Sequence, residues 1–206
     1  MLELTILGFL ADGPLHGYEL RRRVAHLTGH ARPVSDGSLY PAVNRLVAKG
    51  LLERRSEPGT SAAQRHVLTL TEAGRAHLLE RLRQPGEQEI TDKTRFFTLL
   101  AFLSRLPDAA ERRAVLRRRL DFLETPASFF YDGDGTPIRA EQVADPYRRG
   151  MLLIARASSR AERAWLHEQL DADGAPAAPA DGRADAPAGH APAPAPTPGT
   201  TPEETP

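Results

Sequence analysis

The stretch from Pro33 to Leu52 constrains the fold more than any other part of the chain. Its apolar side chains recur at intervals of three and four residues, which is typical of a helix with one buried face. Ser35 is suited to cap the start of this helix, and Gly50 is suited to end it in the left-handed conformation. Other elements must cover the predicted buried face, which consists of Leu39, Val43, Leu46 and Val47.

Two predicted helices precede this stretch and supply that cover. The first spans residues 2–11 and is apolar enough to be mostly buried, and the second runs from about His16 to Thr28. We expect Gly17 to permit a tight helix entry and Tyr18 to be a core aromatic. Three short helices with a tight second connection predict a helix-turn-helix core. Its inward side chains would be Leu2, Ile6, Phe9, Leu10, Leu20, Val24 and Leu27.

The apolar period changes after Gly50. Residues 51–55 and 65–70 are predicted strands, and the polar loop between them contains proline and glycine. Two such strands form a hairpin whose tip can project, which is a wing. Thr71 is suited to cap a fourth helix, Glu72–Arg83, before a break at Pro85-Gly86. We therefore predict a mainly α fold with a small β hairpin, in which residues 1–84 form a winged helix-turn-helix domain.

The outer face of the third helix carries mostly hydrogen-bonding and cationic groups. Such groups can contact base edges and phosphates, so we expect this face to bind DNA. The predicted contacts are Ser38, Tyr40, Asn44, Arg45 and Lys49 on the helix, with Arg54, Arg55 and Arg65 at the base of the wing. Two alternatives stay open. The face is an ordinary polar surface, or the winged helix is a protein–protein adaptor without sequence-specific DNA binding.

Residues 91–170 are predicted to form a second, helical domain. Two helices occupy residues 91–124, an irregular segment follows, and Asp145-Pro146 begins a last helix with a nearly heptad apolar stripe. One subunit need not cover that stripe, so we expect a homodimer. Large apolar residues here either pack in the core and dimer interface, which we favour, or line a pocket for a small aromatic effector: Phe96, Phe97, Phe102, Tyr147, Met151, Ile154 and Trp165.

The last part of the chain, residues 171–206, differs in composition from the rest. It holds nine of the 18 prolines and no aromatic or large aliphatic residue, so we expect it to be disordered. It also carries one Lys or Arg against six Asp or Glu. Residues 1–90 carry 12 against 10, and residues 91–170 carry 14 against 11. The acidic tail therefore masks a mildly basic folded part, although the formal net charge is +0.

Several classes of function lack support in the sequence. There are no cysteines, the histidines show no metal-binding spacing, and no phosphate loop or nucleophile elbow occurs. We therefore expect no enzyme activity, no metal and no cofactor. No apolar run approaches the ~18 residues of a membrane span, and the N-terminus lacks a basic signal-peptide region. These features favour a cytoplasmic protein, associated with the nucleoid when it is bound to DNA.

Four short motifs together resemble the PadR family of bacterial winged-helix transcription regulators. They are His16-Gly-Tyr-Glu-Leu20, Gly37-Ser-Leu-Tyr-Pro-Ala-Val-Asn-Arg-Leu46, Gly50-Leu-Leu52 and the run from Arg65 to Arg75, which appear in the order and spacing of that family. The resemblance implies a regulator, mostly a repressor, whose third helix enters the major groove while the wing touches the flanking backbone. It also implies a dimer made by the C-terminal helices and, in some members, release by small aromatic molecules.

Overall fold

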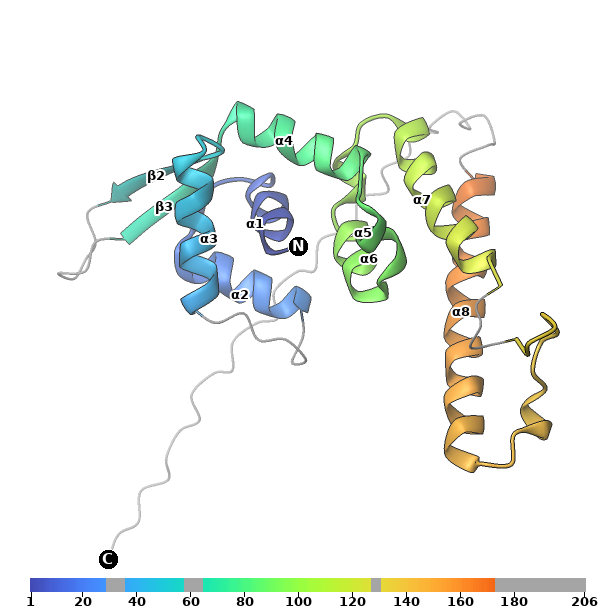
Figure 1. The fold of residues 1–206 in the computed structure, drawn as a ribbon. Helices are drawn as coiled ribbons and strands as arrows, with labels where there is room; N and C mark the ends of the chain where they lie inside the picture. The colour runs from blue at the N-terminus through green and yellow to red at the C-terminus, as the bar shows by residue number, and fades with distance from the viewer. Residues whose placement is uncertain (29–35, 58–64, 127–130, 173–206) are drawn as a thin grey trace, which may run out of the picture. The chain divides into compact units, whose positions relative to one another are not determined.

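The computed structural model describes residues 1–28, 36–57, 65–126 and 131–172, and residues 1–175 group as one compact unit (Figure 1). Helices dominate the described residues, and one small sheet accompanies them. The elements in chain order are α1 (Leu2–Leu10), β1 (Leu15–His16), α2 (Gly17–Thr28), α3 (Asp36–Ala48), β2 (Leu52–Glu57), β3 (Arg65–Leu70), α4 (Glu72–Arg83), α5 (Glu87–Thr91), α6 (Lys93–Leu100), η1 (Leu103–Arg105), α7 (Ala109–Glu124), η3 (Ala140–Gln142) and α8 (Pro146–Ala172).

Helix α1 is the centre of the N-terminal part of the fold, because it contacts α2, α3, α4 and β3 (Figure 1). Its side chains Leu4, Ile6, Leu7 and Leu10 are almost completely buried. The apolar faces predicted for α2 and α3 also turn inward, except that Leu27 is 36% exposed at the end of α2. Hydrophobic burial around α1 therefore assembles the predicted helix-turn-helix core.

The sheet has three antiparallel strands in the order β1-β3-β2. The predicted hairpin is confirmed, with a register that runs from Leu52 opposite Leu70 to Glu57 opposite Arg65. The third strand was not predicted, because the two residues of β1 are too short to show an alternating pattern. They pair with Val67 and Leu68, so α2 begins at Gly17 and is fixed to the wing.

The turn after α3 is hydrogen-bonded to the residue that precedes α4. Gly50 has φ 70°, the left-handed conformation predicted for a helix end, and Thr71 Oγ1 donates to its carbonyl at 2.8 Å. Thr71 also caps α4, because its hydroxyl accepts from Gly74 N at 2.9 Å, as predicted. The backbone approaches so closely here that a Cβ on Gly74 would lie 2.1 Å from the Leu51 carbonyl oxygen. Only glycine fits at this position without displacing the wing.

The C-terminal part is helical as predicted, but its first helix is interrupted. Instead of one element, α6 ends at Leu100 and the chain turns through η1, which buries Leu103 and Leu106. Helix α8 begins after Asp145, whose carboxylate accepts from the backbone N–H of Arg148 at 2.9 Å and of Tyr147 at 2.8 Å. These two hydrogen bonds hold the pKa of the Asp145 carboxyl below its ordinary value.

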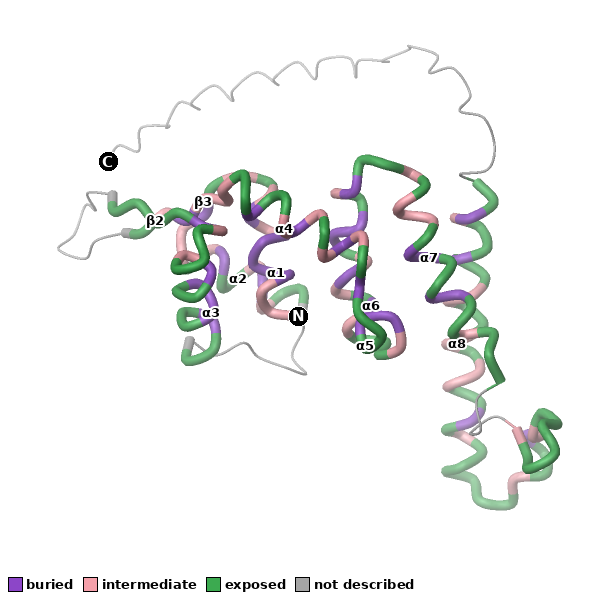
Figure 2. The backbone as a smooth tube through the Cα atoms, turned by 45° about the horizontal axis from the view of Figure 1, so that its top comes forward, coloured by how far each residue is buried: buried purple, intermediate pink, exposed green. Residues whose placement is uncertain are grey.

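One hydrophobic cluster runs from α1 to α8 and joins the two parts of the fold (Figure 2). At the junction, the rings of Phe9 and Phe102 meet edge to face with centroids 5.2 Å apart. A Cβ on Gly8 would lie 2.5 Å from the Phe102 ring, and Arg105 pairs with Asp12 nearby. The division into domains at residues 84 and 91 stays a prediction. Helix α8 continues to Ala172, two residues into the predicted tail, and the remaining tail lies outside the described residues.

Arg119 of α7 is the largest fully buried side chain in the described part of the chain. Its Nε donates to Glu162 of α8 at 2.7 Å, and its Nη1 donates to the carbonyls of Ile90 at 2.5 Å and Thr91 at 3.1 Å. The guanidinium also lies 4.8 Å from the ring centroid of Phe96. One side chain therefore ties α5, α6, α7 and α8 together, and the buried charge is paired and hydrogen-bonded.

Candidate nucleic-acid interface

Helix α3 has the two faces that the sequence predicts. Leu39, Val43 and Leu46 are buried, whereas the other face is open to solvent. The exposed members are Ser38, Tyr40, Pro41, Asn44, Arg45 and Lys49, which we call the α3 face. The predicted N-cap, Ser35, lies outside the described residues. The fold thus presents hydrogen-bonding and cationic groups together along one side of this helix.

Strand β2 supports the middle of the α3 face. Arg54 Nη2 donates a hydrogen bond to Asn44 Oδ1, so the helix and the base of the wing are linked through two of the predicted DNA-binding residues. The link leaves the side-chain amide nitrogen of Asn44 as its donor, and it orients the guanidinium of Arg54. These two residues are ten positions apart in the sequence, and no spacing rule relates them.

Glu3 of α1 is a member of this region that the sequence analysis missed. Its carboxylate lies 3.7 Å from Arg45 Nε and 3.8 Å from Lys49 Nζ. Both cations stay more than half exposed, so these are surface ion pairs that contribute little to stability. The acidic group instead reduces the positive potential at one end of the α3 face.

The base of the wing adds further polar groups. Arg55 is exposed, and its Nη2 lies 3.5 Å from Glu53 Oε2 on the same strand. Ser56 Oγ and His66 Nδ1 lie 3.2 Å apart across the hairpin. Arg65 is the first residue of β3 and pairs with Glu57 in the register, and its side chain lies outside the described part of the protein.

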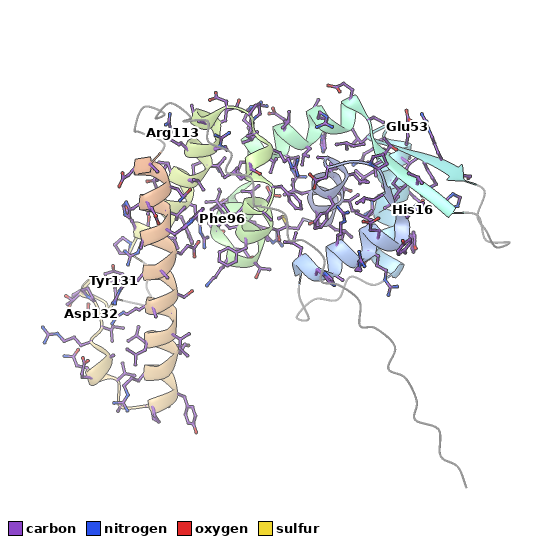
Figure 3. All side chains as sticks on the ribbon, turned by 180° about the vertical axis from the view of Figure 1, so that it is seen from behind. His16, Glu53, Phe96, Arg113, Tyr131 and Asp132 are labelled. Carbon is purple, nitrogen blue, oxygen red and sulfur yellow. The ribbon has the colours of Figure 1, made fainter. Side chains whose placement is uncertain are left out.

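The start of α2 lies close to the α3 face. A Cβ on Gly17 would be 3.7 Å from Cε1 and 3.9 Å from the hydroxyl oxygen of Tyr40. The expectation for Tyr18 was wrong, because this side chain is 68% exposed rather than in the core. It stacks on His16 instead, with ring centroids 6.0 Å apart, at the second residue of α2 and directly after the two-residue β1. His16 and Glu53 lie near opposite edges of the small sheet in Figure 3.

Comparison with known proteins assigns the family. The model of the Transcriptional regulator PadR-like family matches residues 6–80. The transcriptional regulator Rv3488 of Mycobacterium tuberculosis is 42% identical over 81 residues, which are 38% of this chain and 70% of that protein. The chain belongs to the PadR-like family of transcriptional regulators. The match spans α1 to α4, so it includes the α3 face and the wing.

Two further proteins are similar to this chain. An uncharacterised 37.1 kDa protein in transposon TN4556 of Streptomyces fradiae is 42% identical over 79 residues, 38% of this chain and only 21% of that protein. The chain thus spans about a fifth of the length of that relative. Among solved structures, Bacillus subtilis PadR in complex with operator DNA is similar at 20% identity and a TM-score of 0.41, covering 82% of this chain and 98% of that one.

The apolar residues predicted for a dimer interface or effector pocket separate into two groups. Phe96 and Phe102 are buried in the core of this PadR-like chain, as the packing interpretation expects. The other five are exposed by at least 37%: Phe97, Tyr147, Met151, Ile154 and Trp165. Four of these lie on α8, and Figure 2 shows this helix largely exposed in its first half.

Neither a metal-binding cluster nor a membrane-spanning helix occurs among the described residues. No three His, Asp or Glu side chains among them are close enough together to hold a metal ion. None of the helices described is long and apolar enough to cross a membrane.

Proposed function

We propose that this PadR-like regulator binds specific DNA sequences as a homodimer, represses transcription and is released by a small organic molecule. The observation that carries the proposal is the exposed α3 face, which is open to solvent while the rest of the helix is packed. Binding and release of this kind involve no chemical step, so we expect no enzyme activity and no cofactor. A regulator of this kind must reach the chromosome, so we expect it in the cytoplasm, associated with the nucleoid when bound.

The residue types on the α3 face suit two kinds of contact, with base edges and with phosphates. Asn44 and Arg45 are suited to base edges, because an amide can pair with adenine and a guanidinium with guanine in the major groove. Ser38, Tyr40 and Lys49 are suited to phosphate oxygens, which fix the register of a protein on the duplex. At the base of the wing, Arg54, Arg55 and Arg65 would contact the flanking backbone.

DNA binding would rearrange the ion pairs of Glu3 and keep the hydrogen bond between Arg54 and Asn44. The DNA would compete with Glu3 for both cations, a base edge for Arg45 and a phosphate for Lys49, which lie 3.7 and 3.8 Å from the Glu3 carboxylate. Asn44 would keep its amide donor for a base while its oxygen still accepts from Arg54. Arg45 and Lys49 would thus exchange one polar partner for another, so neither cation would lose its hydrogen-bonding partners.

Dimerisation would double the small surface that contacts base edges. Exposed apolar side chains on α8 support it, since Ile154 is 73% exposed and Met151 is 49% exposed on the same stripe. Large apolar groups that are grouped on a surface favour association. Two copies of α3 would then read half-sites about 34 Å apart, one turn of the duplex.

Selection from randomised duplexes tests the proposal directly. Full-length protein at about 0.15 M salt is expected to enrich one motif with two-fold symmetry and half-sites about 10 base pairs apart. Repression is tested by in vitro transcription from a promoter that carries the enriched motif, and added protein should lower transcript yield. If no sequence is enriched over random duplexes, the proposal fails and the adaptor function is favoured.

A further inference from the structure

Strand β2 follows α3 in the chain and packs against it (Figure 1). It carries two adjacent arginines, which lie on opposite faces because the side chains of a strand alternate. Arg54 shares a face with the buried Leu52 and lies opposite the buried Leu68 of β3. Arg55 is on the other face, where its Nη2 lies 3.5 Å from Glu53 Oε2. Arg54 is thus on the face of the strand that turns toward the core and α3.

The backbone that connects α3 with β2 is held in place. Leu51 N donates to the carbonyl of Leu46 at 2.9 Å, which joins the end of α3 to the residue before β2. Strand β2 is in turn paired with β3 from its first residue to its last. The hydrogen bond from Arg54 Nη2 to Asn44 Oδ1 therefore joins two exposed side chains whose backbones are already fixed.

This hydrogen bond determines which end of the Asn44 amide faces away from β2. An asparagine amide has an acceptor at one end and a donor at the other, and rotation about its last side-chain bond exchanges the two ends with little restriction. A guanidinium only donates, so Arg54 can hold the amide oxygen but not the amide nitrogen. With the oxygen held by Arg54, the two N–H groups of the Asn44 amide are the ones left for a ligand of the α3 face.

We infer that Arg54 is a positioning residue, which sets the base preference of Asn44 by fixing the orientation of its amide. The inference rests on the proposed function, since it assumes that the α3 face contacts base edges. While Arg54 holds the oxygen, the amide donates to the major-groove acceptors of guanine, adenine or thymine rather than accepting from the amino group of cytosine. Without Arg54, either end of the amide can turn to the base, so the preference at that base pair is lost. The other N–H groups of the guanidinium stay available for a phosphate.

Anisotropy measurements with full-length protein test this inference, on duplexes that carry each of the four base pairs at each position of the selected motif. The base pair contacted by Asn44 is the one at which Asn44→Ala loses a wild-type preference of about ten-fold or more. Arg54→Ala should reduce the preference at this same base pair to less than about three-fold.

The matched control is Arg55→Ala, which removes the same charge from the neighbouring exposed position on the opposite face of β2. This variant should bind all duplexes more weakly by one factor, with a salt slope smaller by about one, because it loses a phosphate contact and no base contact. Its base preferences should equal those of wild type. If Arg54→Ala behaves in the same way as Arg55→Ala, the inference is overturned.

Asn44→Asp tests the orientation of the amide directly. The new carboxylate accepts from Arg54 as the amide does, but it has no N–H to donate to a base. We therefore expect the preference at that base pair to shift toward cytosine, whose amino group is a donor. If Asn44→Asp keeps the wild-type preference, Asn44 does not act as a donor and the inference fails.

Nuclear magnetic resonance without DNA separates this inference from the proposed function. Relaxation of the Asn44 side-chain amide, identified by its loss in Asn44→Ala, should give an order parameter of about 0.8 in wild type and in Arg55→Ala, and below about 0.6 in Arg54→Ala. Equal order parameters in the three proteins would overturn the inference, whether or not a motif is selected. If a motif is selected but Arg54→Ala keeps its base preferences, the inference fails and the DNA-binding proposal stands. If no motif is selected, the proposed function fails, and the relaxation still decides whether Arg54 holds the amide.

Discussion

At the residue scale, Glu3 shows how the free protein limits its own positive charge. Its carboxylate lies within 4 Å of both Arg45 and Lys49, although it comes from a different helix. The two cations are exposed enough that the pairs add little to stability. We expect Glu3 to act on the proposed DNA binding instead, because its carboxylate would face phosphates and oppose the approach of the duplex.

Replacing this carboxylate should therefore tighten DNA binding. Glu3→Gln is expected to raise affinity for any duplex by about five-fold, the equivalent of roughly 1 kcal/mol for one exposed charge interaction. Fluorescence anisotropy at fixed salt measures the change. Glu168→Gln removes the same charge from an exposed position on α8 and should leave affinity unchanged. Equal behaviour of the two variants would show that Glu3 does not act on the α3 face.

We expect Gly→Ala substitutions at two positions to change the unfolding free energy in opposite directions. Gly74→Ala would put a Cβ 2.1 Å from the Leu51 carbonyl oxygen and 2.7 Å from Leu70 Cδ1, so we expect a decrease of about 2–3 kcal/mol in unfolding free energy. Gly150→Ala meets nothing within 4 Å and lies inside α8, so we expect an increase of about 1 kcal/mol from helix propensity. Urea unfolding of both variants checks the pair, and a stable Gly74→Ala protein would contradict the close packing.

The sequence predicts well whether a residue is buried or exposed where a periodic pattern of apolar side chains determines it. The alternating faces of α3 are as expected, whereas Tyr18 is exposed although an aromatic near a helix start suggested the core. Arg119 was missed in a run of arginines, although its spacing from Leu116, Leu120 and Leu123 puts it on the buried face of α7. Arg54 was among the predicted DNA contacts, but its hydrogen bond to Asn44 and the place of Glu3 beside the α3 face could not be predicted, because only tertiary packing brings these residues together.

At the scale of elements, the paired charge of Arg119 and Glu162 holds α7 against α8. Arg119→Leu would leave Glu162 buried without its partner, and we expect a decrease of about 3–5 kcal/mol in unfolding free energy. The double variant Arg119→Leu plus Glu162→Leu removes both charges and should recover a large part of that decrease. Thermal unfolding of the three proteins measures the coupling. If the double variant is no more stable than the single, the charge pair is not what joins the helices.

Element boundaries follow local chemistry where a cap or glycine marks them. Thr71, Gly50 and Asp145 all act as predicted at the ends of helices. The sequence did not predict β1, because a two-residue strand exists only through its pairing with β3. The break after Leu100 was also missed, since the apolar run continues through η1 and gives no local signal of a turn.

At the scale of the whole molecule, the proposed pairing of two chains would depend on the exposed apolar side chains of α8. Sedimentation at micromolar concentration should give twice the 22.5 kDa mass of one chain. Ile154→Glu would bury a charge in the interface and is expected to give monomers, whereas Arg149→Glu on the other side of the helix should remain dimeric. A wild-type monomer at this concentration would contradict the dimer, and an unchanged Ile154→Glu dimer would exclude this stripe.

The sequence predicts the fold and the candidate site of the first half of the chain in more detail than those of the second half. The motifs of the first half are specific in order and spacing, so both its winged-helix fold and the α3 face follow from them. The second half offers only apolar periodicity, which predicts helices but not their partners. A cavity lined by Arg156, Arg160 and Arg163 forms where Tyr131 and Pro137 pack beside α8, and that packing has no signature in the sequence.

Sequence-specific binding by the α3 face is tested most directly by the ratio of affinities for the selected duplex and a scrambled duplex, measured at about 0.15 M salt. We expect a ratio of at least about 10³ for wild type. For the folded variant Asn44→Ala plus Arg45→Ala, we expect the ratio to fall about ten-fold or more for each base-reading side chain removed. Arg117→Ala, at an exposed site on α7, should keep the wild-type ratio. An unchanged ratio in the double variant, with its circular dichroism spectrum intact, would show that the α3 face does not read the sequence.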